Sequence, residues 1–294
     1  MNYYEKIKKE LVNNEINKKV KDYSKNKYEL EKYYNVGKML YEAGKHYGDG
    51  IIKEYSKRLT DELGKGYTQS RLRYFRRFYD IFSKCPTLSD ELSYSHYCEL
   101  IWIDDFDKIN YYINLSIKQN LSVRQLREKI KLNEYERLPE DTKNKIVGND
   151  RLEVVEFIKN PILIKNSFKN EIVSEKVLQK LILEDISSFL EELGEGFTFI
   201  RNEYKIKLGD RYNYIDLLLF NIEYNCYVVI ELKVTELKKE NIGQIQVYMN
   251  YIDENVKKVC HDRTVGIIIC RQDNSYVIKY CSDDRIISRI YELV

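Results

Sequence analysis

The first half of the chain carries apolar and aromatic residues at helical spacing. The segment 51–63 repeats them every three or four positions and stops at Gly64-Lys65-Gly66, where glycine commonly ends a helix. Thr68 or Ser70 can cap a following helix, and Ser122 can cap a later one. The pattern predicts an all-helical domain of five or six helices. A further stripe on one helical face comprises Leu30, Tyr33, Tyr34, Gly37, Leu40 and Tyr41.

The second half has a different periodicity. A long helix is predicted over 172–193, followed by strand-like segments at 197–208, 212–220 and 226–234. Residues 239–254 return to helical spacing, and 264–270 form a short, almost wholly apolar strand of the kind that is covered on both faces. This order predicts an α/β sandwich, so that the whole chain is an α+β two-domain protein.

The junction between the two halves is marked by prolines. Pro139 and Pro161 flank a polar stretch without clear periodicity. We therefore expect a helical domain over 1–140, a linker over 141–170 and an α/β domain over 171–294. The length of 294 residues agrees with two domains at about 150 residues each.

Charge and cysteine content narrow the class of protein. The net charge is only +2, but residues 1–150 carry 29 basic and 24 acidic side chains, whereas 151–294 carry 20 and 23. A basic patch is thus expected in the first half. No apolar run approaches the ~20 residues of a membrane span, and no secretory signal is visible. The three histidines and six cysteines show no zinc-ligand spacing, and the cysteines show no CxxC pairing. Together with the absence of a secretory signal, this leads us to expect a protein of the reducing cytoplasm.

Two predicted strands hold charged residues where apolar ones are expected. Asp216 lies among isoleucine and leucine in 214–220, and Glu231 and Lys233 interrupt a β-branched strand. The two-residue period of a strand sends Glu231 and Lys233 to one face. Burying an unpaired carboxylate costs several kcal/mol, so a cation must compensate it. That cation is either Lys233 or a bound metal ion.

Mg²⁺ or Mn²⁺ suits these residues, because it prefers oxygen ligands and keeps several waters. Asp216 and Glu231 would supply carboxylates, and the carbonyl of Leu232 a third oxygen. Lys233 could then orient an attacking water or stabilise developing negative charge. The spacing D-x14-ExK, after a helix carrying Glu184, resembles the PD-(D/E)xK nuclease fold. Gln244 and Tyr248 add the QxxxY element found in some nucleases of that fold.

Each of these features has a purely structural alternative. Glu231 and Lys233 could form a supporting ion pair at a strand edge. Glu184 has Asp185 and Glu191 as neighbours, any of which could be a solvated surface carboxylate, and Gln244 could be an exposed helix residue. The combination of strand context, Asp216, Glu184 and QxxxY favours the catalytic interpretation.

The resemblance extends beyond the nuclease motif. The chain is similar to the YhcG family from about residue 28 to 281, and this family has a helical, winged-helix-like DNA-binding domain fused to a PD-(D/E)xK domain. The resemblance implies a bacterial DNA nuclease with a role in repair, restriction or defence, and allows a homodimer or a partner protein. It rests on the segments 34–38, 47–48, 92–97, 121–127, 189–197, 214–218 and 229–233.

The chain departs from the family pattern at three positions. Tyr94 and Leu121 stand where the family often has tryptophan, and Ile215 replaces the proline of the motif name. The first two changes exchange one aromatic or apolar core residue for another. None of the three alters a residue expected to bind metal or substrate.

An arginine-rich helix is the expected DNA contact. The helix 51–63, the turn 64–67 and the helix 70–82 form a helix-turn-helix candidate. Its second helix has Arg73 and Arg77 one turn apart, opposite the apolar stripe, and a solvated basic face is the alternative. His96 and Trp102 are expected in the core. The arginines assigned to DNA are Arg71, Arg73, Arg76 and Arg77.

These expectations define two functions of different classes. The first is an Mg²⁺- or Mn²⁺-dependent endonuclease that cleaves DNA phosphodiester bonds by in-line attack of water. The second is a non-catalytic accessory protein that binds nucleic acid and retains a vestigial nuclease fold. Asp216, Glu231 and Lys233 favour the first, since a scaffold gains nothing from charged residues in an apolar strand.

Overall fold

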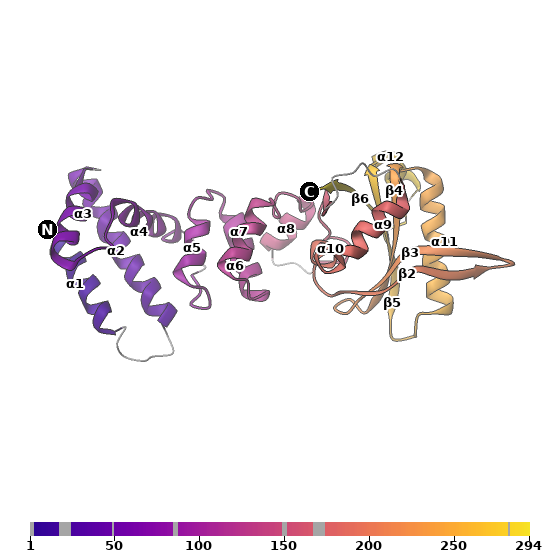
Figure 1. The fold of residues 1–294 in the computed structure, drawn as a ribbon, viewed down its shortest axis with the longest axis horizontal. Coiled ribbons are helices and arrows are strands. Elements are labelled where there is room, and N and C mark those ends of the chain that lie inside the picture. The colour runs from indigo at the N-terminus through magenta and orange to yellow at the C-terminus, as the bar shows by residue number, and fades with distance from the viewer. Residues whose placement is uncertain are drawn as a thin grey trace. The chain divides into compact units, whose positions relative to one another are not determined.

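The computed structural model describes residues 3–17, 25–48, 50–84, 88–148, 152–166, 174–281 and 283–294. The chain divides into two compact units, Met1–Tyr135 and Glu136–Val294. Figure 1 shows that the first consists of helices and that the second is built around a β-sheet. Among the described residues, no helix has the length and apolar character needed to span a membrane.

The first unit is helical, as expected, and its described part contains seven helices rather than five or six. Short helices such as the seven-residue α5 hold too few turns to give a clear periodic signal. The helices are α1 (Tyr3–Asn17), α2 (Lys25–Tyr47), α3 (Ile51–Leu63), α4 (Gln69–Phe82), α5 (Tyr94–Leu100), α6 (Phe106–Lys118) and α7 (Val123–Lys131).

Helix α4 forms the centre of the first unit. Phe75 and Phe78 on this helix are fully buried, and Thr68 caps its start by accepting a hydrogen bond from the backbone N–H of Arg71. Helices α2 and α4 are in direct backbone contact at Gly37, where an added Cβ would lie 2.1 Å from the carbonyl oxygen of Phe75. Gly37 is therefore required by close helix packing and not by an unusual backbone angle.

His96 and Trp102, both expected in the core, are buried to different extents. The ring of His96 is half-buried, contacts Ser93 and donates from Nε2 to the carbonyl of Leu121 at 2.9 Å. Trp102 is 59% exposed, so its expected burial is wrong. It lies in the turn after α5, where its ring meets that of Tyr74 edge-on.

The second unit contains a six-stranded sheet in the order β1-β6-β5-β4-β3-β2. The strands β2, β3 and β4 are antiparallel neighbours, whereas β4, β5, β6 and β1 run parallel. The elements are α8 (Glu140–Gly148), β1 (Ile162–Ile164), α9 (Glu175–Glu184), α10 (Ile186–Leu193), β2 (Phe197–Leu208), β3 (Arg211–Asn221), β4 (Cys226–Glu236), α11 (Lys239–Asn255), β5 (Asp262–Gln272), α12 (Ser275–Cys281) and β6 (Ile286–Leu293).

Both faces of the sheet bury apolar residues. On one face, Val228, Ile230 and Leu232 of β4 pack into a core with α9 and α10. On the other, Val229 packs with residues of α11 such as Ile245. Strand β5 is buried continuously from Thr264 to Cys270, which matches the strand predicted to be covered on both faces.

The expected linker over 141–170 is corrected by the structure. Residues 141–148 belong to α8, residues 162–164 form β1, and Val154 and Ile158 lie in the core of the second unit. The unit boundary falls at Tyr135 and Glu136. A three-residue strand and a short helix show no clear periodicity, so in the sequence the two prolines indicate a domain boundary there. Residues 149–151 and 167–170 of that linker lie outside the described part.

The expected helix over 172–193 is two helices that meet at Asp185. This residue ends α9 and begins α10, and its side chain accepts the backbone N–H of Ser188. Residues 172–173 of the expected helix lie outside the described part. The sequence analysis also missed β6, because Ile286–Leu293 mixes apolar and charged residues without a regular alternation.

Candidate active site

The charged residues of β3 and β4 meet where the two strands separate. The register between β3 and β4 ends with the pair Leu217 and Ile230, and Asp216 and Glu231 are the next residues on the two strands. The Oδ2 atom of Asp216 accepts a hydrogen bond from the backbone N–H of Leu232 at 2.8 Å. Asp216 is thus fixed against β4 directly beside Glu231.

Glu231 and Lys233 form a buried ion pair. The two side chains belong to residues with 2% and 8% exposure, and Lys233 Nζ donates to Glu231 Oε1 at 2.9 Å. Lys233 Nζ also lies 3.3 Å from Oε1 of Glu175, at the start of α9. The ion pair that the sequence left as a structural alternative therefore exists.

This ion pair leaves half of the Glu231 carboxylate without compensation. The Oε2 atom of Glu231 is buried and accepts no hydrogen bond from any described group. Burial, and then the neighbouring Asp216, raise the pKa of Glu231 to about 7. A buried carboxylate oxygen without a hydrogen-bond partner is costly, so a cation beside Oε2 would stabilise it.

The two neighbouring groups respond to the same surroundings. Burial raises the pKa of Asp216, although the Leu232 N–H and the Lys233 ammonium act in the opposite direction. Burial alone would lower the pKa of Lys233, but Glu231, Glu175 and Asp216 outweigh it and leave that pKa raised. The site therefore holds more negative than positive charge when its carboxylates are ionised.

Glu175, and not Glu184, is the helix carboxylate that reaches this cluster. Glu184 lies nine residues further along α9, about 13 Å along the helix axis, and its partner is Lys180 at 3.9 Å. The expectation for Glu184 is corrected for this reason. The helix starts at Ser174, which caps it, and so directs its first turn toward Lys233.

Gln179 is a second residue that the sequence analysis missed. Its side chain is buried, and its amide nitrogen donates to the backbone carbonyl of Asp216 at 2.9 Å. It stands one turn after Glu175, so a single helix face supports both Asp216 and Lys233. The signal in the sequence was a pair of polar residues four positions apart directly after a capping serine.

The QxxxY pair lies on α11 near the same cluster. Gln244 Nε2 donates to the hydroxyl of Tyr248 at 3.0 Å, and Tyr248 is 5% exposed. Burial raises the pKa of Tyr248, Glu231 and Asp216 also raise it, and Lys233 lowers it. The charges of Glu231, Asp216 and Lys233 thus act on the Tyr248 hydroxyl, with which Gln244 forms its hydrogen bond.

The residues present fit a hard divalent cation. The free Oε2 of Glu231 and the carboxylate of Asp216 are oxygen donors, and the carbonyl of Leu232 stays a predicted third ligand. In the described part of the chain, no group of three or more His, Cys, Asp or Glu side chains is arranged to hold a metal ion. Two carboxylates suffice for Mg²⁺, which keeps several waters and also takes oxygens from a substrate phosphate.

The four arginines of α4 have different surroundings. Arg71 donates to the Gly66 carbonyl and the Tyr33 hydroxyl, at 3.2 and 3.4 Å. Arg77 donates to the carbonyl of Ile101 and to Asp104, and it lies over the ring of Trp102. Arg76 also has a partner. Arg73 is exposed and makes no hydrogen bond or ion pair with a described residue.

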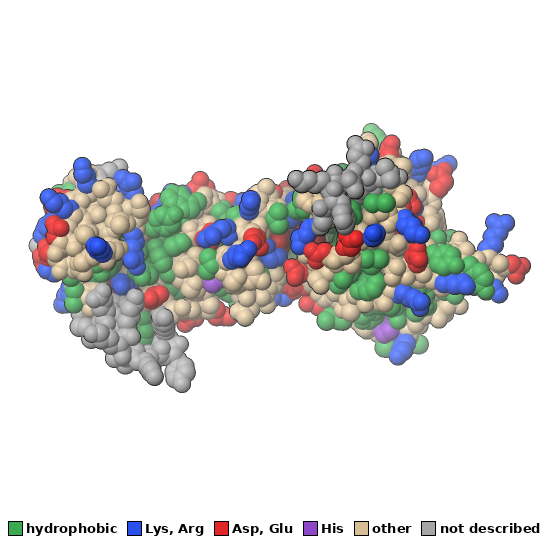
Figure 2. Space-filling view, in the orientation of Figure 1, with side chains coloured by type: hydrophobic (Ala, Val, Ile, Leu, Met, Phe, Trp, Pro, Cys, Tyr) green, Lys and Arg blue, Asp and Glu red, His purple; other side chains and the backbone are tan. Residues whose placement is uncertain are grey.

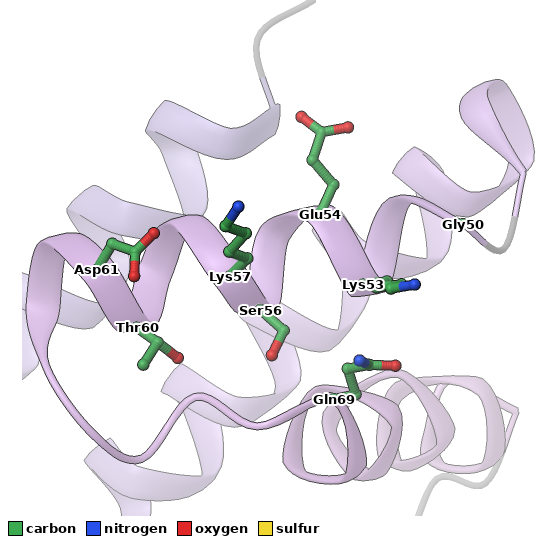
Figure 3. Close-up of a pocket in the computed structure, with 8 residues that line it drawn as sticks. All are labelled: Gly50, Lys53, Glu54, Ser56, Lys57, Thr60, Asp61 and Gln69. Carbon is green, nitrogen blue, oxygen red and sulfur yellow. The ribbon is translucent and has the colours of Figure 1, made fainter.

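A groove of about 540 Å³ lies between α3 and the start of α4. Figure 3 shows Ser56, Thr60 and Gln69 beside the space between the two helices. The lining includes Lys53 and Lys57, but also acidic residues of α3. Charge alone therefore does not mark the groove as an anion site.

Comparison with known proteins agrees with this geometry. The second unit, with an aspartate and an ExK motif on adjacent strands, resembles the PDDEXK endonucleases. A family model described as YhcG PDDEXK nuclease domain matches residues 155–290, and one described as DUF1016 N-terminal domain matches residues 6–137. Together the two matches span most of the chain, which belongs to the YhcG family.

Individual relatives are distant. The protein YhcG of Escherichia coli strain K12 is 23% identical over 284 residues, covering 82% of this chain and 76% of that protein. A repair endonuclease from Pyrococcus abyssi is 19% identical with a TM-score of 0.29, and a complex of EndoMS with double-stranded DNA is 17% identical with a TM-score of 0.30. These matches cover 43% and 44% of this chain and about half of each solved chain, 49% and 48%. Such TM-scores are too low to carry an inference about function.

Proposed function

We propose that this protein is a metal-dependent nuclease that hydrolyses phosphodiester bonds of DNA. The observation that carries the proposal is the buried Oε2 of Glu231, which has no hydrogen-bond partner among the described residues and lies beside Asp216 and Lys233. A protein that used Glu231 only for structural support would pair both oxygens or replace the residue by an apolar one. The family's nuclease domain supports the same function.

Each residue of the cluster has a proposed role. A bound Mg²⁺ or Mn²⁺ would supply activation of water and neutralisation of the phosphate. Asp216 and Glu231 would hold that ion, with the Leu232 carbonyl as an additional ligand. Lys233, held by Glu231 and Glu175, would donate to a phosphate oxygen or to the attacking water as negative charge develops. Gln244 would keep the Tyr248 hydroxyl oriented toward the same space.

The helical unit is proposed to bind the DNA. Helices α3 and α4 are joined by the short segment 64–68, the arrangement expected of a helix-turn-helix. Recognition helices contact DNA mainly through their first turns, where α4 exposes Arg71 and Arg73. Arg77 is engaged inside the unit and Arg76 has a partner, which makes Arg73 the strongest candidate of the four.

The alternative is a non-catalytic accessory protein that binds nucleic acid. The Glu231–Lys233 pair favours it, because an ion pair of this kind also stabilises a fold without chemistry. A role in bacterial repair, restriction or defence, with a second copy or a partner protein, is the setting that the family resemblance suggests for either function.

Incubation of the purified protein with supercoiled plasmid tests the proposal. We expect nicked or linear products with Mg²⁺ or Mn²⁺, and none when the metal is chelated. Mobility shift of a DNA duplex in the presence of chelator measures binding without cleavage. Binding without cleavage under any divalent cation would leave the accessory function.

A further inference from the structure

The β2–β3 hairpin is a two-stranded ribbon that extends beyond the sheet. Strand β3 pairs with β4 only from Leu217 onward, whereas it pairs with β2 as far as the turn at Gly209 and Asp210. Figure 1 shows the hairpin projecting past α11. The free part of the ribbon begins next to Asp216, so it is continuous with the candidate active site.

The two faces of this ribbon differ. Ile206 and Ile215 lie in the core against α11, and Tyr204 and Leu208 pack against that core. The side chains between them point to the opposite face by strand alternation. That face carries two register pairs, Lys205 with Tyr214 and Lys207 with Tyr212, all of them exposed.

Aromatic and basic groups alternate across this exposed face. Tyr212 and Tyr214 are 55% and 52% exposed, and Lys205 Nζ lies 3.7 Å from the centre of the Tyr212 ring. Figure 2 shows basic side chains (blue) next to side chains of the hydrophobic class, which includes tyrosine (green), at this end of the second unit. The acidic residues nearby are Glu203, next to the active site, and Asp210, in the turn.

We infer that this face of the hairpin, Lys205, Lys207, Tyr212 and Tyr214, binds duplex DNA beside the bond to be cleaved. The inference rests on the proposed nuclease function and names the contact that holds its substrate. Lysine ammonium groups neutralise phosphates, and tyrosine hydroxyls hydrogen-bond to phosphate or sugar oxygens. A two-stranded ribbon also has a width that the major groove of B-DNA admits.

The spacing along the ribbon agrees with this occupant. Tyr214 precedes Asp216 by two residues, about 7 Å along the strand, and the Lys207–Tyr212 pair is about 13 Å away. Duplex DNA rises about 3.4 Å per base pair, so these two pairs lie about two and four base pairs from Asp216. The lysines would therefore contact phosphates flanking the cleaved one and leave that phosphate to the active site.

The test compares three full-length proteins that all carry Glu231→Gln, so that no cleavage interferes with binding. The first has no other change, the second adds Lys205→Ala and Lys207→Ala, and the third adds Lys180→Ala and Lys258→Ala as a matched loss of exposed charge on the same unit. Affinity for a 30-base-pair duplex is measured with chelator at several salt concentrations, and sedimentation measures the oligomeric state.

We expect the hairpin variant to bind about tenfold more weakly than the matched control, with a slope of log K against log salt flatter by up to about two units. Equal affinity and slope in the two variants would overturn the inference. A changed sedimentation coefficient with unchanged DNA affinity would also overturn it, because the face would then hold a second copy.

Kinetic measurements distinguish a DNA contact of the hairpin from a role in metal binding. In the otherwise wild-type protein, Lys205→Ala with Lys207→Ala should raise KM for a duplex substrate and leave the metal concentration for half-maximal rate unchanged. If wild-type protein does not cleave DNA at all, the proposed function fails, while the binding comparison still decides whether the hairpin contacts DNA.

Discussion

The two carboxylate oxygens of Glu231 have different surroundings. Oε1 accepts a hydrogen bond from Lys233, whereas the buried Oε2 accepts none from the described residues, and Asp216 lies beside it. Lys233 offsets part of the charge of this carboxylate. Glu231 is therefore expected to destabilise the fold when it is ionised and no cation is bound.

The stability of the metal-free protein should therefore fall with rising pH. A carboxyl with a raised pKa holds its proton more tightly when folded, so its contribution is full below about pH 4.5 and is lost as the pH rises through about 7. The shift corresponds to about 3 kcal/mol, to order of magnitude. Calorimetry of the second unit's transition in chelator should show this loss in wild type and a smaller one in Glu231→Gln. Equal pH profiles would show that Glu231 does not titrate in this range.

The matched pair Glu175 and Glu184 tests which end of α9 belongs to the site. Glu175→Gln removes a partner of Lys233, and we expect cleavage to slow about tenfold or more. Glu184→Gln should leave the rate within about twofold, because Glu184 is exposed and pairs with Lys180 on the same helix. Rates on supercoiled plasmid at saturating Mg²⁺ measure both. The reverse ranking would restore the original assignment of Glu184.

At the level of secondary structure, the sequence predicted strands better than it predicted helix ends. The apolar alternation around Glu231 and Asp216 located β3 and β4 and their charged residues. Apolar periodicity does not reveal that α9 begins after its cap at Ser174, near the site, or that it ends at Asp185. Glu175 was missed for that reason, and β6 because its pattern is irregular.

Helix α4 offers a test of the DNA-binding surface. Arg73→Ala should make the negative slope of log K against log salt for duplex binding shallower by about 0.9, because it removes one contact between an exposed arginine and a DNA phosphate. Arg77→Ala should leave the slope unchanged and lower the melting temperature, because Arg77 holds Ile101 and Asp104. Fluorescence anisotropy across a salt series and thermal melts separate the two. A larger slope change for Arg77 would contradict this surface.

The contact between α2 and α4 is testable with two glycines of one helix. Gly37→Ala forces a Cβ into the Phe75 carbonyl and should destabilise the first unit by about 2 kcal/mol or more. Gly44→Ala meets only the flexible tip of Arg76 at 3.3 Å and should be neutral or stabilising by up to about 1 kcal/mol. Trp102, the chain's single tryptophan, reports unfolding of this unit by fluorescence. Equal stability of the two variants would show that α2 and α4 are not in this contact.

For the whole molecule, the two units carry net charges of opposite sign. Residues 1–135 have an excess of six positive charges, whereas residues 136–294 have an excess of four negative ones. Under the proposed function, the acidic unit would need a cation where it meets a phosphate, and a divalent ion between Asp216 and Glu231 would supply it. Lys205 and Lys207 would add positive charge along the hairpin that leads to that site.

Cleavage of supercoiled plasmid with Mg²⁺ by wild type, Asp216→Asn, Glu231→Gln and Lys233→Ala tests whether this cluster is a metal-dependent nuclease site. The first two substitutions preserve shape and remove ligand charge, and the third removes the ammonium group. We expect wild type to nick the plasmid and each variant to lose cleavage by at least about a hundredfold, with duplex binding and folding retained. Variants that unfold at lower temperature, beside a wild type that shows no metal-dependent cleavage, would contradict the account and leave a structural ion pair.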